Sequence, residues 1–62
     1  MENNIHVLRM RQQLTQQELA DAVNVTRQTI NAIENNKYDP TLSSAFALAE
    51  RLETTVDQLF QH

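Results

Sequence analysis

The stretch "AVNVTRQTINAIENNKYDP", residues 22 to 40, decides the fold of this chain. Only Asn24, Val25 and Thr26 separate two segments with a helical pattern, and another chain reversal follows near Asn36. The chain contains no glycine, and asparagine is the next best residue for the left-handed conformation that often follows a helix. We therefore expect Asn24 and Asn36 to turn the two corners. The spacing around Asn24 predicts a helix-turn-helix.

Helix-capping residues recur along the whole chain, and no segment alternates like a half-buried strand. The pattern predicts an all-α fold, a compact five-helix domain over residues 1–62. The expected helices start at Asn3 or Asn4 (ending near Gln12), at the Thr15–Glu18 capping box, at Thr26 (ending near Asn35), at Pro40 or Thr41, and at Thr55. The expected core is the apolar set on their inner faces: Ile5, Leu8, Leu19, Val23, Ile30, Ile33, Leu42, Ala45, Phe46, Ala49, Leu52, Val56, Leu59 and Phe60.

The composition limits the possible functions. A chain of 62 residues buries only about 60% of its unfolded surface, which is enough for one small domain. It has no cysteine, and its two histidines, His6 and His62, lie near opposite ends of the sequence. No disulfide, metal site or cofactor is therefore expected. No segment has the apolar length of a membrane span or the pattern of a signal sequence, so a cytoplasmic location is expected.

The net charge of −3 is unevenly distributed along the chain. Residues 1–38 carry four basic and four acidic side chains, which sum to zero. Residues 39–62 carry one arginine against four acidic residues, which sum to −3. The acidity therefore belongs to the C-terminal third, and a surface that binds a polyanion is expected within the first 38 residues.

The helix expected over about 27–35 has an unusual polar face. Its amides Gln28, Asn31 and Asn35 point away from its apolar residues, with Arg27 beside them. An ordinary solvated face favours Glu and Lys pairs instead. In a major groove, arginine can pair with guanine O6 and N7, and glutamine or asparagine with adenine N6 and N7. The pattern predicts that this face reads bases; the alternative is an ordinary solvent-facing surface of a helical bundle.

The segment from Leu14 to Leu42, "LTQQELADAVNVTRQTINAIENNKYDPTL", resembles the helix-turn-helix of the Cro and lambda-repressor-like (XRE) transcriptional regulators. The resemblance extends more weakly to "IHVLRMRQQ" and "AERLETTVDQLF". It implies a lambda-repressor-like fold of five helices, the third of which enters the major groove. The family often has glycine at Gln13, Asn24 and Asn36. A left-handed Gln13 would cost on the order of 1 kcal/mol, so we expect either that strain or a differently shaped first turn.

The resemblance also implies which residues contact DNA. Base edges would be contacted from the start of the recognition helix, by Arg27, Gln28 and Asn31. The DNA backbone would be contacted by Gln16, Thr26, Asn35, Lys37, Arg11 and Tyr38, and Gln16 would also buttress the third helix. Because one helix reads one half-site, regulators of this kind bind pseudo-palindromic operators as two-fold dimers. A homodimer formed through the fifth helix is therefore expected.

One charged residue falls on the inner side of the first helix. A lone charge at Arg9 would be costly to bury, so this arginine needs an acid. Glu34 projects from the core-side shoulder of the third helix, and the same family commonly pairs an arginine and a glutamate at these positions. We expect a structural salt bridge and no catalytic use. His6, on a flank of the first helix, is expected to be simply exposed.

The predicted function is sequence-specific binding of double-stranded DNA by a transcriptional regulator, specifically a repressor associated with the nucleoid. The alternative is a protein-interaction module, such as an antitoxin-like or regulator-docking domain. The acidic C-terminal third favours that alternative, and so do apolar residues outside the tightest inner faces or near the chain end: Val7, Met10, Leu48, Leu59 and Phe60. Neither enzymatic activity nor a small-molecule ligand is expected, since no Ser or Cys is placed beside a histidine and no Gly-rich phosphate loop is present.

Overall fold

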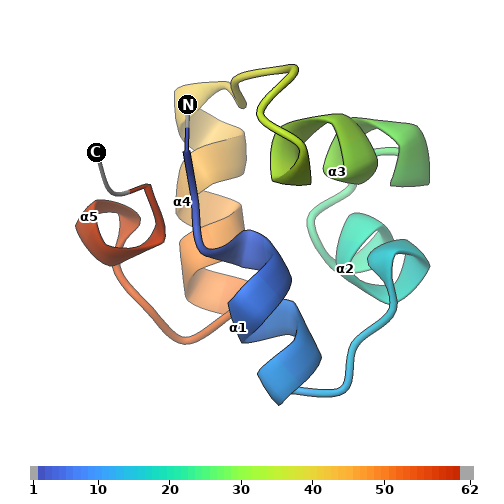
Figure 1. The fold of residues 1–62 in the computed structure, drawn as a ribbon, viewed down its shortest axis with the longest axis horizontal. Helices are drawn as coiled ribbons and strands as arrows, with labels where there is room; N and C mark the ends of the chain where they lie inside the picture. The colour runs from blue at the N-terminus through green and yellow to red at the C-terminus, as the bar shows by residue number, and fades with distance from the viewer. Residues whose placement is uncertain (1, 61–62) are drawn as a thin grey trace.

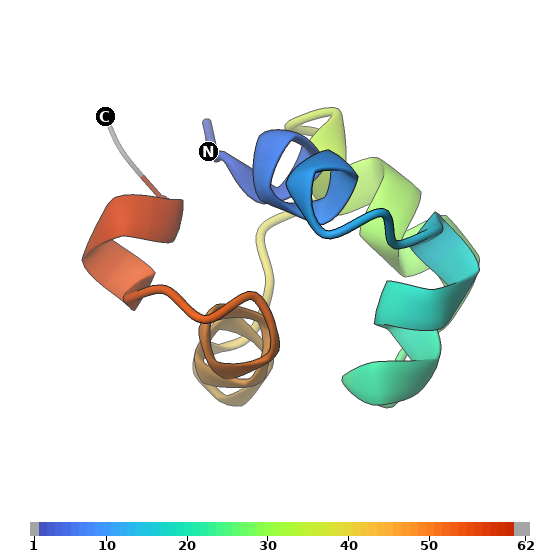
Figure 2. The same ribbon diagram turned by 90° about the horizontal axis from the view of Figure 1, so that it is seen from below.

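The computed structural model describes residues 2–60, so the expectation that concerns His62 lies outside the described residues. The helices in this range are α1 (Ile5–Arg11), α2 (Gln16–Ala22), α3 (Arg27–Glu34), α4 (Leu42–Arg51) and α5 (Val56–Leu59) (Figure 1). Residues 2–60 contain no strand, and the predicted all-α class of five helices is confirmed. Figure 2 shows α5 and α2 on opposite sides of the molecule, with α1 and α4 between them.

Threonine begins each of the last four helices. In every case its hydroxyl accepts a hydrogen bond from the backbone N–H three residues later, as the N-cap pattern predicts; the threonines are Thr15, Thr26, Thr41 and Thr55. The capping box at α2 is complete, because the Glu18 carboxylate also accepts the Thr15 N–H at 2.9 Å. The first helix is capped differently. Its N-cap residue Asn4 makes no side-chain cap, and Asn3 Oδ1 accepts the Ile5 N–H at 3.1 Å instead.

Four non-glycine residues with left-handed backbone turn the corners between helices. Gln13, Asn24, Asn36 and Glu53 have φ between 58° and 61°. After each of them the next N–H donates to a carbonyl five residues back, which closes the end of the preceding helix. The predicted corners at Asn24 and Asn36 are confirmed. Two alternatives were expected for Gln13, and the structure has the strained, left-handed one. The left-handed turn at Glu53 was not predicted.

The core lies where all five helices meet. It consists of Ile5, Leu19, Ala20, Ile30, Ile33, Ala45, Leu48, Ala49, Leu52, Leu59 and Phe60, with Leu8, Leu14, Val23, Val25 and Val56 packed partly buried against it. Most of the predicted core is therefore confirmed. The buried apolar side chains of α2 and α3 hold the helix-turn-helix against the rest of the domain.

Two predicted core residues of α4 are on the surface. Leu42 is 70% exposed and Phe46 is 58% exposed, so their assignment to the core was wrong. The helix buries the stripe that contains Ala45 and Leu48 instead. Leu42 and Phe46 are one helical turn apart and therefore share one face of α4. On a helical wheel, this face lies beside the buried stripe.

Leu48, predicted to lie outside the tightest inner faces, is a core residue, and the predicted core positions of Leu59 and Phe60 are confirmed. Leu48 and Leu59 are fully buried, and Phe60 is 8% exposed. The apolar side chains at the end of α5 are therefore used inside the domain. Among the apolar residues outside the inner faces, Val7 and Met10 are the ones that remain exposed, at 48% and 56%.

Candidate nucleic-acid interface

The polar face of α3 lies on the surface of the domain. Arg27, Gln28, Asn31 and Asn35 are all exposed, whereas the opposite face of α3 is buried in the core. This separation follows from the sequence, since apolar residues three apart form one side of a helix and the amides form the other. Within residues 2–60 the side chains of Arg27 and Gln28 make no hydrogen bond, so their polar atoms are available to a ligand.

The exposed charges within the segment that holds this face, residues 26–38, are positive although the chain is acidic. Residues 26–38 contain Arg27, Glu34 and Lys37 as their charged residues. Arg27 and Lys37 are exposed, but the Glu34 side chain is only 5% exposed and is paired with Arg9. Within this segment, every charge that reaches solvent is therefore basic. Such a surface favours a polyanion despite the net charge of the chain.

A buried ion pair fixes the back of α3 to α1. Arg9 Nε donates to Glu34 Oε2 at 2.8 Å and Arg9 Nη2 donates to Glu34 Oε1 at 3.1 Å, which confirms the predicted salt bridge as a bidentate pair. Arg9 Nη1 donates to the Leu14 carbonyl at 2.8 Å, so the same guanidinium also ties down the turn before α2. Bidentate geometry and the extra hydrogen bond offset the cost of removing both charges from water.

Two further side chains complete the surroundings of Glu34. Gln16 Nε2 donates to Glu34 Oε1 at 3.3 Å, and His6 Nδ1 lies 3.2 Å from the same oxygen. Burial acts to raise the pKa of Glu34, but the hydrogen bonds from Arg9 and Gln16 and the charge of Arg9 outweigh it and lower the pKa below its ordinary value. The carboxylate is therefore ionised at neutral pH.

His6 does more than the sequence predicted. Its side chain is exposed, as expected, but Nδ1 also lies 3.0 Å from Arg9 Nη2. Asn3 was predicted only as a possible cap of the first helix, yet its Nδ2 also donates to the Ile33 carbonyl at 2.8 Å and joins the N-terminal segment to the end of α3. No local pattern could have indicated the contact of Asn3, since Asn3 and Ile33 are 30 positions apart.

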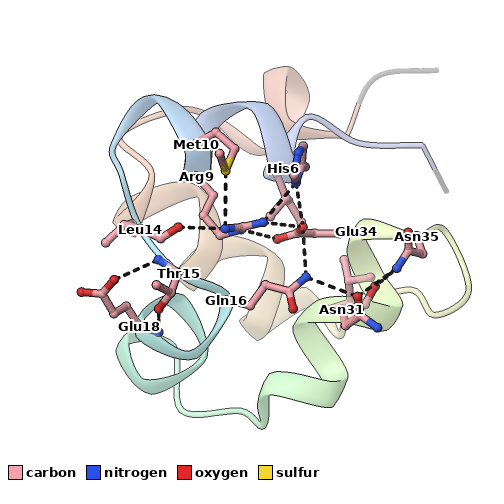
Figure 3. A network of polar contacts seen from close by, with 12 residues as sticks. His6, Arg9, Met10, Leu14, Thr15, Gln16, Glu18, Asn31, Glu34 and Asn35 are labelled. Atoms are coloured by element: carbon pink, nitrogen blue, oxygen red, sulfur yellow. Dashed lines mark hydrogen bonds and ion pairs between the residues drawn. The ribbon is translucent and has the colours of Figure 1, made fainter.

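Polar contacts also connect this ion pair to the exposed face of α3 (Figure 3). Gln16 Nε2 donates to Asn31 Oδ1 at 3.3 Å as well as to Glu34, and Asn35 Nδ2 donates to Asn31 Oδ1 at 3.0 Å. The predicted buttress from Gln16 to the third helix is thus present. We call the six side chains of this network the Arg9–Asn31 network: His6, Arg9, Gln16, Asn31, Glu34 and Asn35.

Two open grooves flank α3 and contain most of the predicted DNA contacts. One groove brings Gln16 and Arg27 together with residues of the α1–α2 turn. The other brings Thr26 and Gln28 together with Tyr38, which follows α3. The exposed Lys37 directly precedes Tyr38.

Arg11 is placed elsewhere. It lines a different groove, with Asn4 and Leu8 on α1 and with Thr54 and Gln58 near α5. The structure therefore does not bring Arg11 to the two grooves beside α3. Among the described residues, no group of three or more His, Cys, Asp or Glu side chains is arranged to hold a metal ion. Over the same residues, none of the helices combines the length and apolarity needed to cross a membrane.

Comparison with known proteins identifies the family. A helix-turn-helix family model matches residues 5–59. An uncharacterized HTH-type transcriptional regulator of Methanocaldococcus jannaschii is 42% identical over 60 residues, which cover 97% of this chain and 91% of that protein. One of Archaeoglobus fulgidus is 37% identical over 97% of this chain and 86% of that protein. The uncharacterized regulator YgzD of Bacillus subtilis is 35% identical over 97% and 91%. The chain therefore belongs to the Cro and lambda-repressor-like (XRE) family of helix-turn-helix transcriptional regulators.

Proposed function

We propose that this protein binds double-stranded DNA in a sequence-specific manner, with α3 inserted in the major groove. The exposed face of α3 carries the proposal. It presents amide and guanidinium groups in a segment whose solvent-exposed charges are all basic, and a buried ion pair holds the helix from behind. A surface held in place before binding loses less conformational entropy when it meets its ligand.

The side chains divide into two roles. Arg27, Gln28 and Asn31, on the exposed face, contact base edges and choose the sequence. The backbone of DNA is contacted by side chains at the ends and flanks of α3, which position the domain without sequence preference: Gln16, Thr26, Asn35, Lys37 and Tyr38. Arg11 is left out of this set because it lies in a different groove.

The binding unit in this proposal is a homodimer on a pseudo-palindromic operator, because a single α3 covers only one half-site. Within α5, Leu59 is fully buried and Val56 is partly buried against the core, so little apolar area of this helix is left for the contact expected of it. Leu42 and Phe46 provide an exposed apolar pair on α4 instead. Bound at an operator, the dimer acts as a repressor by occupying DNA that other proteins would contact, and this binding places it on the nucleoid.

The proposal is tested by selecting bound sequences from a random pool of DNA duplexes. We expect a palindromic consensus with half-sites about one helical turn apart. The affinity for that consensus should fall steeply as salt rises, since bound phosphates release counterions. A protein-interaction module would enrich no sequence, and its apolar contacts with a partner would depend little on salt. Failure to enrich any duplex would overturn the proposal.

A further inference from the structure

The amide of Asn31 is held by two hydrogen bonds that it accepts. Gln16 Nε2 lies 3.3 Å from Asn31 Oδ1, and Asn35 Nδ2 lies 3.0 Å from the same atom. The oxygen of an asparagine amide has two lone pairs, so these two donors occupy it fully. In the proposed complex Asn31 faces DNA. Its only acceptor atom, Oδ1, is therefore already hydrogen-bonded within the protein before DNA binds.

The orientation of this amide is forced by groups that can only accept. The nitrogen of Gln16 also donates to the ionised carboxylate of Glu34 at 3.3 Å, so Gln16 must present its NH₂ group at this point. The nitrogen of Asn35 also donates to the backbone carbonyl of Asn31 at 2.9 Å, which fixes Asn35 in the same way. Turning the Asn31 amide over would bring its NH₂ group against two other NH₂ groups.

The free end of Asn31 is consequently a donor. Asn31 Nδ2 donates no hydrogen bond within residues 2–60, and Figure 3 shows this nitrogen directed away from Gln16 and Asn35. An asparagine that pairs with adenine N6 and N7 must offer both its oxygen and its nitrogen. That pairing would require the hydrogen bond from either Gln16 or Asn35 to break.

We propose that Asn31 reads DNA only as a hydrogen-bond donor, and that it selects a base whose major-groove edge presents acceptors without an amino group, namely guanine or thymine. The inference rests on the proposed function and specifies the chemistry of one of its contacts. Guanine presents O6 and N7 and thymine presents O4, whereas cytosine presents only its N4 amino group. Adenine presents N7 as an acceptor, but its N6 amino group lies beside N7 and would oppose the NH₂ group of Asn31. The Arg9–Glu34 ion pair thereby acts as a positioning element for specificity, through Gln16.

Selection from a random duplex pool with the Asn31→Asp variant tests the proposal. Aspartate keeps the shape and still accepts from Gln16 and Asn35, but its outward atom becomes an acceptor. For the original chain we expect one base pair of each half-site to carry guanine or thymine on one particular strand, and for the variant we expect cytosine or adenine on that same strand. The relative preference should change by about tenfold or more. Gln28→Glu is the matched control, because it adds the same charge to the same face and should alter a different base pair.

The outcomes separate this inference from the proposed function. If no duplex is enriched by the original chain, the proposed function fails. If a consensus appears but Asn31→Asp leaves every position unchanged, or if it replaces guanine by thymine or thymine by guanine on the same strand, then the donor assignment is wrong while DNA binding stands.

A second measurement needs no DNA. In the free protein, hydrogen exchange of side-chain NH₂ groups can be followed by ¹⁵N NMR. We expect the NH₂ protons of Asn31 to exchange as fast as those of Gln28, which is exposed and makes no side-chain hydrogen bond in the described residues. The NH₂ protons of Gln16 and Asn35 should exchange more slowly. Slow exchange at Asn31 together with fast exchange at Gln16 would overturn the orientation.

Discussion

Arg9 Nε lies 2.8 Å from Glu34 Oε2, and this buried contact joins α1 to the back of α3. The Arg9 side chain is 8% exposed and that of Glu34 is 5% exposed. Two charged groups buried to this degree stabilise each other, because either one alone would lose its hydration without gaining a counter-charge. Through Gln16, the same pair is also connected to the amide of Asn31 on the exposed face of α3.

Removing the acid from this pair should destabilise the fold. We expect Glu34→Ala to lower the free energy of unfolding by roughly 3 kcal/mol, because it leaves the Arg9 guanidinium buried without a counter-charge. That is a large part of the stability of a domain this small. Urea denaturation measures the change. Glu50→Ala removes an exposed glutamate from α4 and should change stability by less than about 0.5 kcal/mol. Equal effects of the two substitutions would refute the structural role of the ion pair.

The contribution of Glu34 should also depend on pH. Burial opposes ionisation of Glu34, but the hydrogen bonds and charge around it lower its pKa below the ordinary value of 4.5. The ionised form is thus favoured by folding, so its contribution is complete above about pH 4.5 and is lost as the pH falls through the folded pKa. We expect the stability difference between the original chain and Glu34→Gln to be largest near neutral pH and to shrink in acid. A difference that stays constant from pH 7 to pH 3 would contradict this.

Relief of backbone strain should stabilise the first turn. Gln13 has φ 58°, a conformation that glycine adopts without the Cβ clash. We expect Gln13→Gly to raise the free energy of unfolding by up to about 1 kcal/mol, reduced by the greater freedom of glycine in the unfolded chain. Asn24→Gly provides the comparison, since asparagine already tolerates φ 61° and should gain less. Thermal unfolding distinguishes the two, and a larger gain at Asn24 would argue against this account of the strain.

The two basic residues near α3 should differ in their effect on DNA binding. Arg27→Ala should weaken binding to the selected duplex by about 1 to 3 kcal/mol and relax the preference at one base pair. Lys37→Ala should weaken binding to all sequences and reduce the salt dependence by about one counterion. Fluorescence anisotropy with selected and scrambled duplexes measures both effects. If both substitutions weaken binding to every sequence equally, the division into base and backbone contacts is wrong.

The exposed apolar pair on α4 should contribute to self-association. We expect the double substitution Leu42→Ser and Phe46→Ser to shift the chain toward the monomer in sedimentation equilibrium, with little change in the stability of the folded monomer, because both side chains are mostly exposed. Val7→Ser, which alters another exposed apolar residue on α1, is the control and should leave the association unchanged. A dimer that persists after the double substitution would place the interface elsewhere.

Local signals in the sequence were sufficient to predict the helices and corners that shape the site. The hydroxyl of Thr15 or Thr26 needs only the next turn of chain to form a cap, and an asparagine at position 24 or 36 tolerates left-handed backbone by itself. Helical periodicity alone separates the polar face of α3 from its buried one. The left-handed turn at Glu53 was missed because glutamate carries no such preference.

Tertiary structure decided the features that depend on contacts between distant segments. In α4, apolar residues at helical spacing occupy two neighbouring faces, and the sequence does not say which face is buried. Only packing against the other helices shows that Leu48 is buried while Phe46 is exposed. The polarity of the Asn31 amide depends on Gln16 and on an ion pair between residues 25 positions apart. The sequence by itself determined the local backbone and the polar face, because short-range hydrogen bonds and periodicity set both. Which apolar stripe is buried and which way an amide points follow from long-range contacts, which exist only once the chain has folded.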